Sequence, residues 1–210
     1  MSDDERLRLV ALVAREPGLA MLRGLPLDLG PIRLCAIYTH RLLPRSEDPR
    51  RGERPEYPRY VELARELRVP LHTVDAPTDA ERLAGLEPYR PFDILLSLSW
   101  RYRVPTHVLG WPRLAPINLH RGKLPDYAGA EPVRRALSAA EKSITLTAHV
   151  MTEEIDAGPI LVERTHAVGG VGGPTRAGDV ERIKHELWPL YPQVAIGAIE
   201  RVTGPLRAQV

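Results

Sequence analysis

Residues 92–98 read FDILLSL, a short apolar run of the kind that forms a strand buried in a sheet. Comparable strand signals occur at residues 7–14, 32–39, 69–74, 115–119, 144–151 and 160–163. Several of the segments between them have helical patterns, at residues 18–29, 58–67, 79–85, 132–137 and 179–190. Strands that alternate with helices predict an α/β fold with an open, mostly parallel sheet and helices on both faces. Ligands of such sheets bind beyond the carboxyl ends of the strands.

The composition predicts one globular domain over residues 1–210. The formal charge is only +2 and gives no sign of a nucleic-acid partner. No apolar run reaches the roughly 18 residues of a membrane span, and the acidic N-terminus does not resemble a signal peptide. Cys35 is the single cysteine, so no disulfide can form within the chain. We therefore expect a cytoplasmic protein that does not bind membranes.

Residues 41–59 are rich in arginine, proline and acidic residues and contain few apolar ones. This composition predicts an exposed, mobile loop between a strand and a helix. Its arginines could surround an anionic ligand. The alternative is a solvated loop of mixed charge, because four acidic residues are interleaved with the arginines, namely Glu47, Asp48, Glu53 and Glu56.

Polar groups that can carry chemistry follow one another in the second half of the chain. Asn118-Leu119-His120 ends a predicted strand, Leu124-Pro125 and Gly129 follow, and Asp156-Ala157-Gly158 comes after an alternating strand. An amide and an imidazole can stabilise an oxyanion, and a carboxylate can accept and return a proton. Each element alone is common in loops, so the indication of a catalytic site lies in their joint order.

In this order, the motifs resemble the catalytic core of the folate-dependent formyltransferases, a family with a Rossmann-like fold. The resemblance implies that 10-formyltetrahydrofolate is the co-substrate and that no metal is needed. It implies that Asn118 and His120, the latter as imidazolium, donate to the oxyanion. It also implies that Asp156 accepts the proton of the attacking amine.

The resemblance also implies which residues enclose the folate. Apolar walls and backbone groups are typical of such pockets. Two readings of His149 are open: it lies beside the catalytic water, or it is a satisfied surface histidine. The expected folate-binding residues are Leu98, Arg103, Val104, His149, Thr152, Glu153, Glu154 and Ile155.

The acceptor is expected to be the primary amine of a small molecule. Glu16-Pro17 stands where the glycinamide ribonucleotide branch has a phosphate-binding turn, and the chain ends at Val210 without the basic domain of the transfer-RNA branch. A nucleotide-linked amino sugar is therefore the favoured acceptor. The alternatives are a glycinamide ribonucleotide formyltransferase, a 10-formyltetrahydrofolate hydrolase and a folate-binding protein without turnover. Trp188 and Tyr191 are expected to pack on their own sheet or on a second subunit of a homodimer.

Overall fold

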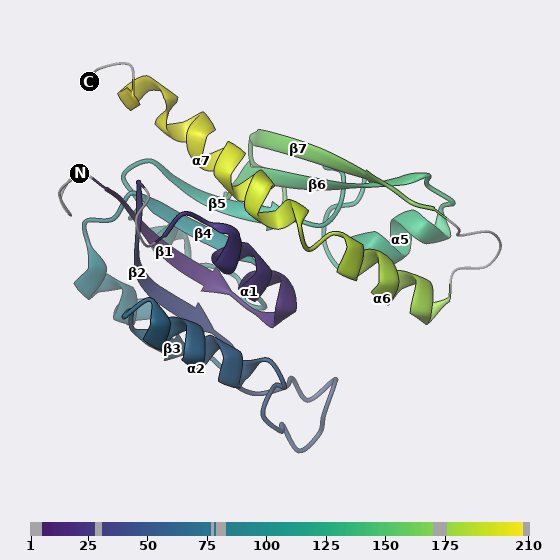
Figure 1. The fold of residues 1–210 in the computed structure, drawn as a ribbon, viewed down its shortest axis with the longest axis horizontal. Helices are drawn as coiled ribbons and strands as arrows, with labels where there is room; N and C mark the ends of the chain where they lie inside the picture. Colours follow the sequence, from purple (N-terminus) through teal and green to yellow (C-terminus); the bar gives the residue numbers. More distant parts are fainter. Residues whose placement is uncertain (1–5, 28–30, 77, 79–82, 170–175, 208–210) are drawn as a thin grey trace.

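The computed structural model describes residues 6–27, 31–76, 78, 83–169 and 176–207. It contains one seven-stranded sheet with the strand order β3-β2-β1-β4-β5-β6-β7 (Figure 1). The neighbouring strands from β3 to β5 are parallel, and β6 and β7 join antiparallel at one edge. The expected mostly parallel sheet is confirmed. The strands are β1 (Leu7–Val13), β2 (Ile32–Thr39), β3 (Leu71–Thr73), β4 (Ile94–Leu98), β5 (Ala115–His120), β6 (Ser143–Val150) and β7 (Ile160–Ala167).

The central strands are apolar on both sides because both faces of the sheet are covered. In β1, Leu9 and Ala11 belong to one hydrophobic cluster, whereas Val10 and Leu12 belong to the cluster on the other face. All five residues of β4 are buried. This two-sided burial explains why the strand signals in the first half of the chain are continuous apolar runs.

The two faces are covered very unequally. Longer helices pack on one face, where Figure 1 shows α1 and α7 crossing the strands. The other face is covered by a 3-10 helix, η2 (Leu83–Tyr89), and by the single turn α4 (Thr106–Leu109). On the first face lie α1 (Arg15–Gly24), α2 (Tyr57–Glu66), α5 (Pro132–Ser138), α6 (Ala177–Glu186) and α7 (Leu190–Arg207). None of the described helices is long and apolar enough to cross a membrane.

The expected last helix is two helices in the structure. α6 ends at Glu186 and α7 begins at Leu190, with Pro192 in its first turn, where a missing N–H costs nothing. The helix expected from residue 179 begins at Ala177, with Arg176 as its N-cap residue, and the Asp179 carboxylate accepts the Arg176 backbone N–H at 3.1 Å. Tyr191 is fully buried in the core of its own chain, so it packs on its own sheet.

Two earlier helices also differ from expectation. The first begins at Arg15, before the expected start at Gly18, because Pro17 is tolerated in a first turn. The helix expected at residues 79–85 lies mostly outside the described residues. Its described end belongs to η2, which begins at Leu83.

Residues 41–56 extend away from the sheet at the lower edge of the view (Figure 1). Much of this loop is exposed, but the expectation of exposure was wrong for Arg54 and Glu56, which are both buried. Their side chains form an ion pair with 3.3 Å between Nη1 and Oε1, which offsets part of the cost of removing both charges from water. The loop end nearest the sheet is therefore part of the packed structure.

Replacing Gly18 by alanine is expected to destabilise the protein. A Cβ there would lie 2.3 Å from the hydroxyl oxygen of Tyr60, which donates a hydrogen bond of 2.9 Å to the Arg15 carbonyl. We expect a loss on the order of 1–3 kcal/mol in the free energy of unfolding, measured by urea denaturation. Gly178→Ala is the matched control, since nothing lies within 4 Å of a Cβ on that exposed helix position. Equal stability of the two variants would contradict the tight α1–α2 contact.

Candidate active site

Asn118, His120 and His149 meet through strand pairing. Asn118 and His120 are two residues apart on β5, so their side chains point to the same face of the sheet. β6 runs antiparallel to β5 and places His149 directly opposite Asn118. The loop that follows β6 brings Asp156 back to the same place.

The Asp156 carboxylate is the centre of this cluster. Its Oδ1 atom lies 3.4 Å from Asn118 Nδ2 and 3.3 Å from His149 Nε2. Its Oδ2 atom lies 3.2 Å from His120 Nδ1 and accepts the backbone N–H of Gly129 at 2.8 Å. The structure therefore brings the three expected catalytic residues together and adds His149 as a fourth member.

Backbone geometry explains how Asp156 reaches this position. It adopts a left-handed conformation with φ of +56°, which aspartate tolerates better than most residues. A Cβ at Gly158 would lie 1.8 Å from the Val150 carbonyl oxygen, so only glycine fits where the loop passes its own strand. Contacts from the 103–106 segment hold the other side of the loop: Arg103 donates to the Glu153 carbonyl, and Thr106 Oγ1 donates to Glu153 Oε1 at 2.8 Å.

The electrostatics keep the Asp156 carboxyl ionised. Burial alone would raise its pKa, but the hydrogen bond with His149, the charge of His120 and the Gly129 N–H together lower the pKa below its ordinary value. A buried carboxylate with this many donors is negative at neutral pH. Its N–H partners also fix the orientation of the carboxylate beside the two side chains of β5.

His120 is held at both ring nitrogens. Nδ1 faces Asp156, and Nε2 lies 2.7 Å from the backbone carbonyl oxygen of Tyr127. Burial lowers the pKa of His120, while Asp156 and the Tyr127 carbonyl oppose this effect. Burial therefore works against the imidazolium that the sequence analysis expected. For Nε2 to donate to a ligand, it must leave the Tyr127 carbonyl.

His149 is not a surface histidine, because only 2% of it is exposed. Its Nδ1 atom lies 3.0 Å from the Val150 carbonyl oxygen, which fixes a hydrogen on that nitrogen. Its Nε2 atom lies 3.1 Å from Asn118 Nδ2 and 3.3 Å from Asp156 Oδ1, within hydrogen-bond distance of both.

A cavity of about 480 Å³ opens in front of these four residues. Of the expected folate-binding residues, Arg103, Val104, His149 and the 152–155 segment line it. Leu98 does not line the cavity, because the alternation of β4 turns it into the core on the face that carries the longer helices. Leu109 and Met151 contribute apolar surface instead.

Two further lining residues, Ser99 and Trp100, were not among the folate-binding residues expected from the sequence. The side-chain oxygen of Ser99 and the indole nitrogen of Trp100 are buried and have no hydrogen-bond partner within the described residues. Such groups are available to a ligand. Both residues directly follow β4, at the carboxyl end of the strand, where ligands of such sheets bind. This position in the sequence is the feature by which they could have been predicted. No group of three or more His, Cys, Asp and Glu side chains that could hold a metal ion occurs among the described residues.

Comparisons with known proteins agree with this geometry. Residues 73–170 match the family model described as formyl transferase. A methionyl-tRNA formyltransferase of Methylococcus capsulatus is 31% identical over 138 residues, which are 64% of this chain and 42% of that protein. Another, of Pseudomonas paraeruginosa, is 30% identical over 182 residues, which are 86% of this chain and 55% of that protein. The chain belongs to the formyltransferase family.

Solved structures show the formyltransferase fold over almost the whole chain. Glycinamide ribonucleotide transformylase 1 from Symbiobacterium toebii has a TM-score of 0.69 and 20% identity, with 94% of this chain and 87% of that chain covered. A formyltetrahydrofolate deformylase from Pseudomonas syringae has a TM-score of 0.68 and 17% identity, with 91% of this chain and 60% of that chain covered. This formyltransferase chain spans about half the length of the curated relatives that it matches.

A buried histidine, His40, packs behind two residues that line the cavity, Trp100 and Arg101. Its Nδ1 atom donates to the Val74 carbonyl at 2.5 Å, and its Nε2 atom accepts the Arg101 backbone N–H at 3.2 Å. Its ring stacks on Trp100 with 4.4 Å between centroids. Burial lowers the pKa of His40 to about 4, so the ring is neutral and fixes the backbone of Val74 and of the cavity residue Arg101.

The buried His40 predicts a loss of stability in mild acid. Between the ordinary value of 6.5 and the folded-state value of about 4, the unfolded chain binds a proton that the folded chain does not. Stability therefore falls as the pH is lowered through this window, by an amount on the order of 2–3 kcal/mol. Urea unfolding between about pH 7 and about pH 4.5 measures it. His40→Asn should flatten the dependence, whereas His107→Asn, at an exposed position, should keep it. Identical pH curves for the wild type and His40→Asn would refute this origin.

Proposed function

We propose that this protein transfers a formyl group from 10-formyltetrahydrofolate to a primary amine. The observation that carries the proposal is the ionised Asp156 carboxylate, held among an amide and two imidazoles beside a cavity with one apolar wall. Ionised carboxylates in such clefts are candidates for proton transfer. The family match supports the same chemistry.

The cavity suits a folate. Val104, Leu109 and Met151 offer apolar surface to a flat ring, and the buried polar atoms of Ser99 and Trp100 can bond to its edge. Ile155 is 66% exposed beside the cavity, where a ligand would cover it. When bound, 10-formyltetrahydrofolate supplies the formyl group and a nitrogen leaving group.

The residues then have separate tasks. Asn118 Nδ2 gives up one of its two contacts, with His149 Nε2 or with Asp156 Oδ1, and donates to the formyl oxygen as negative charge develops on it. Asp156 accepts the proton of the attacking amine, directly or through one water, and returns it to the leaving nitrogen. His120 and His149 keep Asp156 ionised and oriented. His149 also affects oxyanion stabilisation, because its Nε2 atom contacts the Asn118 amide and orients it.

For the acceptor, we propose an amine attached to an anionic group, with a nucleotide-linked amino sugar as the leading candidate. Arg101 lines the cavity, and Arg54 and Arg15 lie near His40, because the charges of all three arginines help lower the pKa of His40. Arg54 is 3% exposed, and its Nε atom has no partner within the described residues. A diphosphate would gain several charge-assisted hydrogen bonds here. An aminoacyl-tRNA is the second candidate, since the curated relatives are named methionyl-tRNA formyltransferases.

The test of the chemistry is Asp156→Asn. The substitution keeps the shape of the side chain but removes the base, so formyl transfer should fall by on the order of 10²–10⁴-fold. Affinity for a stable 10-formyltetrahydrofolate analogue should stay within a few fold, because the folate lies along other walls. Asp126→Asn is the matched control: this exposed carboxylate pairs with Lys123 outside the cavity, and its loss should leave turnover unchanged. Turnover by Asp156→Asn close to that of Asp126→Asn would remove Asp156 from the mechanism.

The same assay separates the alternatives when it is run with different acceptors. The panel is a nucleotide-linked amino sugar, methionyl-tRNA, glycinamide ribonucleotide and water alone. Formylation of one amine identifies the acceptor, and formate release that no amine suppresses identifies a hydrolase. Folate binding without either product would contradict the transferase proposal and leave a binding protein.

A further inference from the structure

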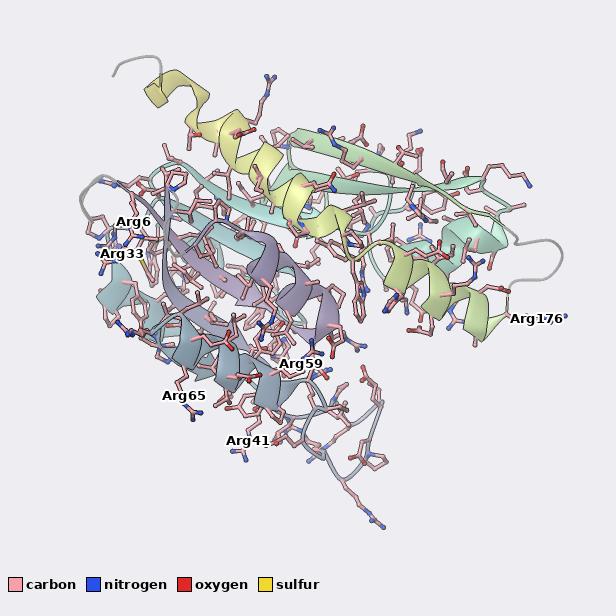
Figure 2. The ribbon with its side chains drawn as sticks, in the orientation of Figure 1. Arg6, Arg33, Arg41, Arg59, Arg65 and Arg176 are labelled. Carbon is pink, nitrogen blue, oxygen red and sulfur yellow. The ribbon has the colours of Figure 1, made fainter. Side chains whose placement is uncertain are left out.

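A second cavity, of about 360 Å³, lies at the opposite end of the sheet from the active site. It is formed where β1 and β2 begin and where the chain passes from α2 to β3. Four arginines line it, Arg6, Arg8, Arg33 and Arg68, and the described residues that line it include no carboxylate. Figure 2 shows Arg6 and Arg33 near one another at this end of the molecule.

Strand register brings two of these charges together. Arg8 of β1 is the direct neighbour of Arg33 of β2. Both point to the face opposite Leu9 and Leu34, so they stand on the same side of adjacent strands. Like charges in this position repel each other unless an anion lies between them. The register therefore places two guanidinium groups side by side at this cavity.

The contacts of these arginines within the chain leave some of their N–H donors unused. Arg8 uses Nη2 to donate to the Tyr89 carbonyl at 3.0 Å, but its Nε atom is buried and has no partner within the described residues. Arg6 and Arg33 each interact with other parts of the chain, and a guanidinium with five N–H donors can bind an anion in addition. Asp93 is the acidic group near Cys35 in the cavity wall, but its carboxylate is held by Arg113 and the Arg8 backbone N–H.

Arg68 occupies a position that normally favours glycine. It follows the end of α2 with φ of +54°, and the Val69 N–H bonds to the Ala64 carbonyl at 2.9 Å, as in the Schellman motif. Glycine is the usual residue at this point because a side chain is strained there. The chain instead places an arginine there, and its side chain lines the cavity.

We propose that this cavity binds a phosphate monoester with a small organic body. Guanidinium groups match the geometry of phosphate oxygens and form charge-assisted hydrogen bonds with them. Leu27, Leu67 and Val69 line the remaining wall and can contact the organic part. The volume lies at the lower end of the roughly 300–1,000 Å³ of small-molecule sites, which limits the ligand to a small ester. The site is separate from the proposed formyl-transfer site and does not depend on that activity.

Calorimetric titration of the full chain at constant ionic strength tests this site, with inorganic phosphate and 5′-AMP as probes. We expect saturable binding of 5′-AMP, and Arg68→Gly should weaken it at least about tenfold. Because glycine relieves the positive φ, the same variant should melt at the wild-type temperature or above it. Arg33→Gln should weaken binding similarly. Arg65→Gln is the charge control, since Arg65 is exposed on α2 and outside the cavity lining (Figure 2).

Each outcome is decisive. If inorganic phosphate binds as tightly as 5′-AMP, the proposal of a phosphate monoester ligand is wrong and the cavity is a site for simple anions. Equal losses in Arg68→Gly and Arg65→Gln, or no loss in either, would place the binding elsewhere. No binding of either probe to the wild-type chain would overturn the site altogether. A stable 10-formyltetrahydrofolate analogue added in excess should not displace 5′-AMP, and displacement would assign the binding to the active site.

Discussion

The active site depends on a single desolvated charge, the Asp156 carboxylate. A carboxylate removed from water is costly unless donors replace the lost hydration. Here the Gly129 N–H, the Asn118 amide and the imidazoles of His120 and His149 surround it. These contacts lower its pKa in spite of burial, so it stays negative at neutral pH. The strands and loops around it are arranged so that these donors meet.

The sheet topology makes that meeting possible. β5 is the last of the parallel strands, and β6 turns back beside it. Because of this reversal, a histidine on β6 lies opposite an asparagine on β5, and the loop after β6 returns over both. Gly158 allows the loop to pass within contact of the strand it has just left. The change from parallel to antiparallel pairing therefore places the carboxylate next to the two side chains of β5.

Much of this arrangement could be predicted from sequence, and the failures have physical causes. The strands were predictable because two-sided burial gives continuous apolar runs, and the order of Asn118, His120 and Asp156 indicated one site. Leu98 was misplaced because its face depends on strand register, which the apolar run of β4 does not reveal. The burial of Arg54 and Glu56 could not be foreseen, because the composition of this segment is that of a solvated loop and its local pairing does not reveal how it packs on the rest of the chain. The contacts of His149 likewise arise from antiparallel pairing and not from any local pattern.

The most direct test of the account is calorimetric titration of the full chain with a stable 10-formyltetrahydrofolate analogue. The account predicts saturable binding at micromolar affinity or tighter, about −8 kcal/mol or better. A Val104→Asp variant, which puts a charge on the apolar wall of the cavity, should abolish that binding. The absence of binding to a folded wild-type chain would contradict the account, because the catalytic cluster would then stand beside a cavity that does not accept the formyl donor.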